Sequence, residues 1–147
     1  MILDRTIRAG SLIWKDISNA KLEYLQELRK QYGFHDLDIE DCLSKSESPK
    51  IEEYKDYIFV VFHFPVKDPH DHIAIASLNV FVGQQYLITI SNGNIKKLDD
   101  LFLDLKTRPS RRKRIFSKGS GYLLYQMMEQ LFTVYSSYIS QLNRSIL

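Results

Sequence analysis

The chain has 147 residues, of which 44% are apolar and 26% are charged, and its formal net charge is +2. The length and composition are typical of one globular domain with a hydrophobic core, and they exclude a disordered chain. Because so small a net charge gives no argument for a nucleic-acid partner, we predict none. The single cysteine excludes an intramolecular disulfide, and no stretch approaches the roughly 18 consecutive apolar residues of a membrane-spanning helix.

The first third of the chain predicts one strand and two helices. Apolar and polar residues alternate over 11–17, which is typical of a short strand. Leucines at helical spacing, followed by Gly33, predict a helix over 19–32. A second, shorter helix is expected over 36–44, with Asp36 as its N-cap.

Three successive strands are expected in the middle of the chain. Residues 57–64 are apolar on both faces and rich in β-branched and aromatic side chains, so they predict a central strand that Pro65 ends. A polar turn over 67–72 leads to a second strand over 73–82, and 86–90 forms a third. We therefore expect an antiparallel meander.

The last third is expected to be mostly helical. Apolar spacing predicts a helix around 98–105 that ends before Pro109, and 108–114 is expected to be a basic loop. From about residue 120, apolar residues step alternately by four and three, which predicts a long helix with a seam of coiled-coil type. The seam consists of Leu124, Met128, Leu131, Tyr135, Tyr138 and Leu142. No stop signal precedes Leu147, so we expect the natural chain to continue.

This order of elements predicts an α/β (α+β-like) fold with three layers. Its sheet is expected to be mixed but mainly antiparallel, with helices on both faces and a long helix at the C-terminal end. We place an α/β domain over 1–118 and the start of the long helix over 119–147.

Acidic residues crowd the segment before the central strand. Glu40 and Asp41 are adjacent, so a helix would point them about 100° apart, which suits a catalytic pair poorly. Mg²⁺ is less demanding, because it keeps several waters and accepts one or two carboxylates from a surface. A simpler interpretation is that these acids favour the positive end of a short helix, and spacing alone favours it.

Two other groups could carry chemistry. Asp68, His70 and His72 place oxygen and nitrogen donors close together, but their spacing matches no structural zinc site and a polar turn explains them. A basic run could bind phosphates or anionic lipid headgroups, although a solvated loop is the simpler interpretation. The run consists of Arg108, Arg111, Arg112, Lys113 and Arg114. The sequence contains no Gly-rich phosphate loop, nucleophile elbow or HExxH motif, so we predict that the chain is not an enzyme.

Five stretches, in this order, resemble the N-terminal cytoplasmic domain of the CorA-type divalent-cation transporters. They are "IWKDI" (13–17), "YGFHDLDIEDCL" (32–43), "SPKIEEYKDYIFVVF" (48–62), "LNVFVGQQYLITI" (78–90) and "GYLLYQMMEQLFTVY" (121–135). The resemblance implies a homopentameric Mg²⁺ or Co²⁺ channel in the cell membrane. It makes 1–118 a regulatory domain that faces the cytoplasm, and 119–147 the start of a stalk helix cut before the membrane helices.

The resemblance also implies a role for two of the acids. In the family, acidic residues of the "LED" type meet a carboxylate on the neighbouring subunit's stalk helix, where a divalent ion bridges the subunits and holds the pore closed. Glu40 and Asp41 match that position, Asp41 more strongly, so the resemblance implies a regulatory Mg²⁺ site that Co²⁺ or Zn²⁺ would also suit.

The sequence departs from the family pattern in three places. Ser48 occupies a position where a basic residue is usual in the family. The segment before Trp14 is short, so we expect the edge strands of some relatives to be missing. The Gly-Met-Asn signature of the pore is absent. Two alternatives stay open. One is the related domain of a Zn²⁺ transporter, in which the donors at 68–72 would be the first place to look, and the other is a free-standing module that binds through its basic loop.

Overall fold

The computed structural model describes residues 3–44 and 48–146, and the side chains of these residues up to 133. Its centre is a six-stranded sheet in the order β1-β2-β6-β5-β4-β3. The strands are β1 (Leu3–Ala9), β2 (Leu12–Ser18), β3 (Lys50–Glu53), β4 (Tyr57–Lys67), β5 (Ile73–Gly83) and β6 (Tyr86–Ser91). The helices are α1 (Leu22–Tyr32), α2 (Asp36–Leu43), α3 (Lys96–Thr107), α4 (Pro109–Phe116) and α5 (Ser120–Ile146).

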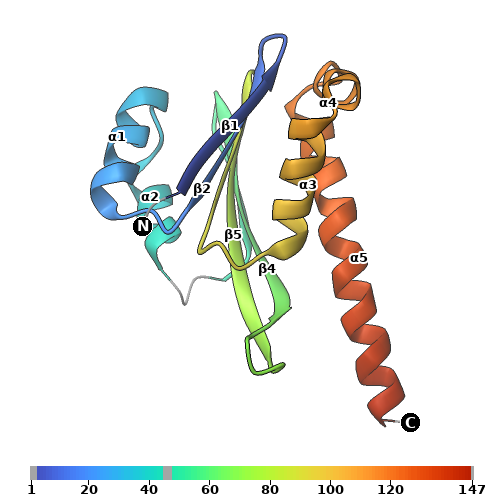
Figure 1. Cartoon of the computed structure of the whole chain (residues 1–147). Coiled ribbons are helices and arrows are strands. Elements are labelled where there is room, and N and C mark those ends of the chain that lie inside the picture. Colours follow the sequence, from blue (N-terminus) through green and yellow to red (C-terminus); the bar gives the residue numbers. More distant parts are fainter. Residues whose placement is uncertain (1–2, 45–47, 147) are drawn as a thin grey trace.

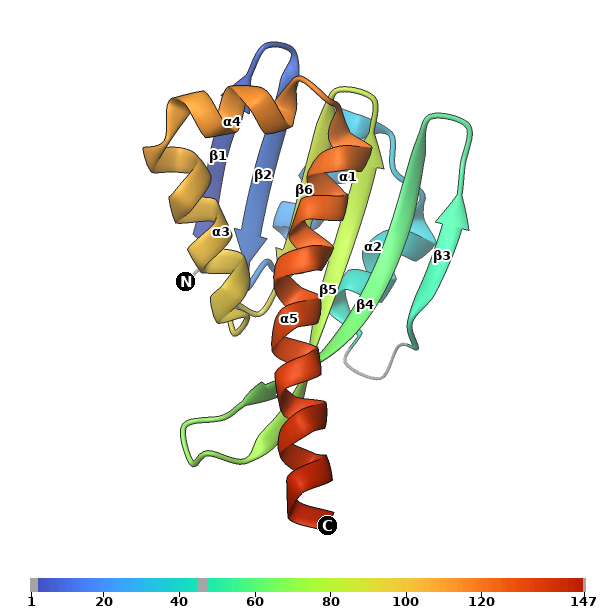
Figure 2. The ribbon, with the colours of Figure 1, turned by 90° about the vertical axis from the view of Figure 1, so that its right-hand side faces the viewer.

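The helices form a layer on each side of the sheet. Helices α1 and α2 cover one face, while α3, α4 and α5 lie on the other (Figure 1). Strand β2 pairs with β6 in parallel, and the other neighbouring strands pair antiparallel. The expected α/β fold, with three layers, a mixed and mainly antiparallel sheet and a long last helix, is therefore confirmed. Figure 2 shows α5 crossing the sheet and extending beyond it.

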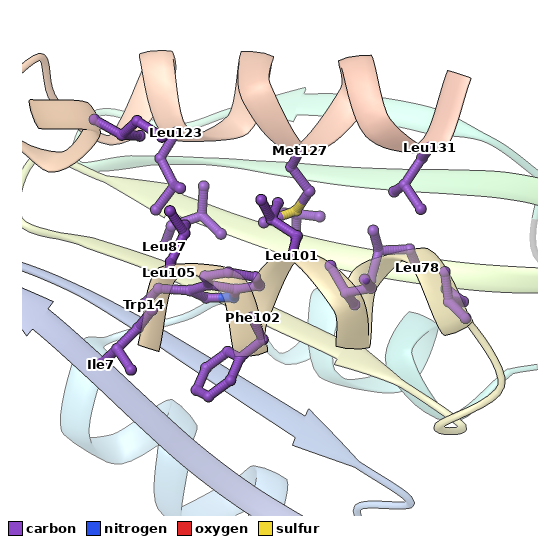
Figure 3. Packing of buried hydrophobic residues seen from close by; sticks show 14 of the residues in the cluster. Ile7, Trp14, Leu78, Leu87, Leu101, Phe102, Leu105, Leu123, Met127 and Leu131 are labelled. Atoms are coloured by element: carbon purple, nitrogen blue, oxygen red, sulfur yellow. The ribbon is translucent and has the colours of Figure 1, made fainter. Parts of the chain in front are cut away.

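Each face of the sheet has its own hydrophobic cluster. Trp14, Leu87 and Leu101 belong to the cluster under α3 and α5, which Figure 3 shows. Phe34, Ile39 and Phe81 belong to the cluster under α1 and α2. A sheet with apolar side chains on both faces buries them only when helices cover both sides, which explains the three layers.

Helix α5 buries a row of residues spaced by four. Leu123, Met127 and Leu131 are buried against the sheet and α3 (Figure 3). The predicted seam was therefore wrong in its first positions: Leu124 and Met128 lie beside this row and are only partly buried. Each step of four residues rotates by about 40° around a helix, so three such residues still lie within one face, while Leu124 and Met128 each lie about 100° further round than the residue before them. Tyr135, Tyr138 and Leu142 lie outside the described side chains.

Four other local predictions differ from the structure. Strands β1 and β3 were not predicted, and β1 shows that an edge strand does precede Trp14. Pro65 does not end β4, because β3 pairs only with residues 58–61 and leaves β4 an edge strand at that point, where a missing N–H group is tolerated. The basic run forms helix α4 rather than a loop, since Pro109 starts it and the buried Ile115 and Phe116 anchor it.

Candidate cation site on helix α2

Helix α2 is placed by the turn that precedes it. Gly33 ends α1 in the left-handed conformation, with φ of 76°, and its N–H group donates to the carbonyl of Arg29 at 2.7 Å. Phe34 then stacks on Phe81 of the sheet, with ring centroids 3.9 Å apart. His35 is the N-cap of α2, and its Nδ1 atom accepts a hydrogen bond from the N–H group of Leu37 at 3.1 Å. The prediction of Asp36 as the cap was wrong by one residue, because the imidazole supplies the acceptor.

A buried aspartate fixes α2 to the strands beneath it. Asp38 is 1% exposed, and it accepts hydrogen bonds from the hydroxyls of Tyr57 at 2.7 Å and Tyr54 at 3.0 Å. Burial raises the pKa of Asp38, an effect that the two hydroxyls oppose. Burial and the same hydrogen bond raise the pKa of Tyr54 to about 12. These bonds prevent α2 from rotating on the sheet.

Sequence reasoning did not single out Asp38. The available signal was its spacing, because Asp38 lies one helical turn before Asp41 and so shares its side of the helix. The tyrosines that satisfy it lie 16 and 19 residues further along the chain, so only the folded structure shows the contact.

The structure separates the two acids of the predicted site. The Glu40 side chain is exposed to solvent. The Asp41 side chain is 12% exposed and forms an ion pair with the ammonium group of Lys50 on β3, whose side chain is 28% exposed. The two carboxylates are therefore available to different neighbours, Glu40 outward and Asp41 at the rim between α2 and β3.

The donor chemistry at this rim suits a hard divalent cation. Carboxylate oxygens are the ligands that Mg²⁺ prefers, and one or two of them are enough when the ion keeps its waters. Among residues 3–44 and 48–133, however, no group of three or more His, Cys, Asp and Glu side chains is placed to hold a metal ion. Asp41 thus fits one side of a metal site, Glu40 adds negative charge on the outward side, and another molecule would contribute the remaining ligands.

The second predicted metal group forms the tip of the β4–β5 hairpin. Asp68 accepts hydrogen bonds from the N–H groups of His70 and His72, both at 2.9 Å. Its other oxygen lies 3.9 Å from Nδ1 of His72, and the two imidazole centroids are 6.5 Å apart. Asp68 therefore organises the turn, which is the simpler of the two interpretations made from the sequence.

The basic residues of α4 are largely engaged within the domain. Arg108 and Arg111 pair with Asp104 of α3 at 3.2 and 2.9 Å. Nη1 of Arg112 donates to the carbonyls of Leu105 and Lys106, both at 3.1 Å, which satisfies the end of α3. Lys113 and Arg114 are exposed. The run thus joins two helices, and Arg108, Lys113 and Arg114 are the members that are exposed to solvent.

Residues 9–147 match the protein family described as CorA-like Mg²⁺ transporter protein. The chain belongs to this family. Membership confirms the resemblance that the sequence stretches carried, and because CorA family members are ion transporters, it confirms that the chain is not an enzyme.

A curated relative and a solved structure illustrate this similarity. The cobalt/magnesium transport protein CorA of Methanocaldococcus jannaschii is 29% identical over 131 residues, which are 89% of this chain and 40% of that protein. The solved soluble domain of CorA from the same organism has a TM-score of 0.75 at 29% identity and covers 92% of this chain and 52% of the other. The chain thus spans about two fifths of the curated CorA relative.

A second solved structure shares the fold alone. The ZntB cytoplasmic domain from Vibrio parahaemolyticus has a TM-score of 0.68 at 13% identity, covering 92% of this chain and 54% of that one. Of the helices in the described part of the chain, none has the length and apolar content needed to cross a membrane.

Proposed function

We propose that this chain is the cytoplasmic regulatory domain of a CorA-type transporter of Mg²⁺ or Co²⁺ in the cell membrane, and that Asp41 with Glu40 senses the internal cation. Family membership supports the transporter. The observation that supports the sensor is the position of Asp41, a carboxylate at the rim of α2 that Asp38 and its tyrosines hold in place. The domain proper then covers 1–118, and 119–147, which contains α5, leads toward the stalk and the membrane part.

The proposed mechanism uses repulsion between carboxylates of neighbouring subunits. Two unit charges 4 Å apart interact by roughly 4 kcal/mol at an effective dielectric constant near 20, so carboxylates that face each other separate unless a cation lies between them. A bound divalent ion therefore favours one arrangement of a homopentamer, which we assign to the closed channel. The ion acts as the regulatory ligand, and α2 supplies a rigid position for it.

The test uses the assembled protein expressed from its complete gene. Resistance to chymotrypsin should rise with Mg²⁺, because a bridged interface opens less often. Asp41→Asn should reduce this rise, and Glu40→Gln should reduce it less. Asp100→Asn is the matched control, since it removes the same charge from α3, where Asp100 pairs with Lys96 at the surface. An unchanged Mg²⁺ response in Asp41→Asn would contradict the sensor assignment.

A Zn²⁺ transporter domain is the second candidate, and the hairpin tip supports it. The Asp68 carboxylate and the imidazoles of His70 and His72 are donors that zinc accepts. If this candidate is right, Zn²⁺ protects the protein at concentrations where Mg²⁺ does not, and His72→Ala removes the protection. Protection by Mg²⁺ that survives His72→Ala would argue for the first candidate.

A further inference from the structure

We propose that Lys50 is a built-in competitor for the cation at Asp41, so that a divalent ion binds there only by displacing the Lys50 ammonium group. This inference rests on the proposed sensor and adds its regulation. The pair would set the concentration at which the domain responds, and it would reject monovalent ions.

The backbone positions of β3 and α2 place the Lys50 ammonium group beside the Asp41 carboxylate. Lys50 is the first residue of β3 and pairs with Val61 of β4, so the sheet fixes its backbone. Asp41 lies in the last turn of α2, which the bonds of Asp38 hold on the same strands. The two charged groups therefore meet because two anchored elements bring them together, and not because two flexible side chains find each other at a surface.

The burial of the pair makes the competition effective. The Asp41 side chain is 12% exposed, so its carboxylate offers solvent and ions a narrow approach, which the Lys50 side chain shares. Coulomb repulsion rises as two cations approach the same oxygens, and it is screened less at a partly buried site. The Lys50 ammonium group occupies Oδ2 of Asp41, so a metal ion that binds through this oxygen, alone or together with Oδ1, must release it.

The charge of an ion determines whether it can displace the Lys50 ammonium group from Asp41. A tethered ammonium group acts at a high effective concentration, so a free ion with one charge gains little by replacing it. A divalent ion has twice the charge and is attracted twice as strongly at the same distance. The exposed Glu40 next to Asp41 adds a second carboxylate on the outward side, which favours a divalent ion further. The Lys50–Asp41 pair thus sets the cation concentration at which the site is occupied, and it selects divalent over monovalent ions.

A purely structural pair predicts the opposite result. If Lys50 only tied β3 to α2, its removal would loosen Asp41, and cation binding would weaken or stay the same. If Lys50 competes, its removal frees the carboxylate, and binding tightens. The direction of the change therefore separates the two roles.

The experiment measures the Mg²⁺ concentration that gives half-maximal protection from chymotrypsin in the assembled protein. Lys50→Gln should lower this midpoint by about two- to fivefold, a shift equivalent to the loss of one partly exposed ion pair. Lys50→Arg keeps the charge and adds a planar fork for the carboxylate, so it should leave the midpoint unchanged or raise it. Lys15→Gln is the matched control, because Lys15 pairs with Asp4 at 3.0 Å with similar burial on the β1–β2 hairpin. It should leave the midpoint unchanged.

A direct measurement on the 147-residue chain complements this series. Mn²⁺ broadens the amide resonances of residues near its site, and we expect broadening at Asp41 at lower Mn²⁺ concentrations in Lys50→Gln than in the natural sequence. If Asp41→Asn abolishes the Mg²⁺ response while Lys50→Gln leaves the midpoint in place, the competition is wrong and the sensor stands. If Asp41→Asn changes nothing, both are wrong. Should Lys50→Gln fail to fold, a lowered midpoint in Lys50→Arg would still overturn the competition.

Discussion

The two faces of the sheet each bury an aspartate, and the two are stabilised in different ways. Under α3, Asp16 accepts hydrogen bonds from Nε of Arg5 at 2.8 Å and from the hydroxyl of Thr89 at 2.6 Å. Under α2, the hydrogen bonds that Asp38 accepts from the described part of the chain come from two neutral tyrosine hydroxyls. Burial raises the pKa of both carboxyl groups. On the α3 face a positively charged guanidinium group thus stabilises Asp16, whereas on the α2 face the dipoles of two hydroxyl groups stabilise Asp38.

The charged network joins more elements than the neutral one. Arg5 of β1 also donates to Asp99 of α3 at 2.5 Å and lies over the ring of Phe102, 4.4 Å from its centroid. Trp14 of β2 donates to Thr89 of β6 at 3.0 Å. The network therefore connects three strands to α3, whereas Asp38 connects α2 to β4 and the turn before it. We infer that both helix layers are anchored, that the α3 face is the more rigid of the two, and that α2, which carries the candidate site, is held by fewer bonds.

The largest effect should come from Arg5→Met. It leaves the buried Asp16 carboxylate without its cation, so we expect the free energy of unfolding to fall by about 3–5 kcal/mol in urea titrations. Arg8→Met on the same strand is the control, because Arg8 is exposed and should matter by less than about 0.5 kcal/mol. Equal losses for the two variants would remove the contrast between the faces.

Tyr57→Phe should have the next largest effect. It removes the shorter of the two hydrogen bonds to Asp38 and the acceptor for the N–H group of His35, so we expect a loss of about 1–3 kcal/mol by the same titration. Tyr54→Phe should cost less, because its bond is longer and its ring less buried. The reverse order would show that α2 is anchored through the β3–β4 turn instead.

The pH dependence of Asp38 should be smaller and have a definite sign. Its pKa is raised in the folded protein, so the folded state binds a proton more readily than the unfolded state. The stability from this group is complete below the unfolded pKa near 4 and is lost as the pH rises through the folded pKa. Relative to Asp38→Asn, the natural protein should therefore gain stability as the pH falls from 7 toward 4. A constant difference between the two across this range would contradict the raised pKa.

The smallest effect is expected for the pair at the rim of α2. Lys50→Gln should lower the free energy of unfolding by about 1 kcal/mol or less without added cation, because the pair is partly solvated. The change is measured by thermal unfolding in a chelating buffer. A loss as large as that of Arg5→Met would mean that the α2 side is as rigid as the α3 side.

The sequence predicted the centre of the fold better than its edges. Strands β4 to β6 were recognisable because side chains on both faces are apolar, as they must be in a doubly covered sheet. Strand β3 has the sequence KIEE and β1 buries only Ile7, so neither shows an apolar alternation. An edge strand forms because the neighbouring strand offers unpaired N–H and C=O groups. The sequence of the edge strand itself therefore gives little sign of it.

The candidate site shows the same limit. Glu40 and Asp41 were identified through resemblance to a family, and spacing alone favoured a simpler role for them. The partners that decide their behaviour were invisible, since Lys50 meets Asp41 only across a helix-to-strand connection and Asp38 meets Tyr57 only after the sheet has formed. Pairings of this kind depend on tertiary placement, which periodicity does not encode.

The parallel pairing of β2 with β6 has a consequence for how the chain folds. The paired residues Ile13 and Tyr86 are 73 positions apart in the sequence, and two helices and three strands intervene between β2 and β6. The β1–β2 hairpin and the β3–β6 meander are local, so each forms without closing a long loop, whereas their joining closes a large one. We therefore expect the joint between them to form last and to limit the refolding rate. Substitutions at this joint, such as Ile88→Val, would then slow refolding more than equally destabilising changes inside either half.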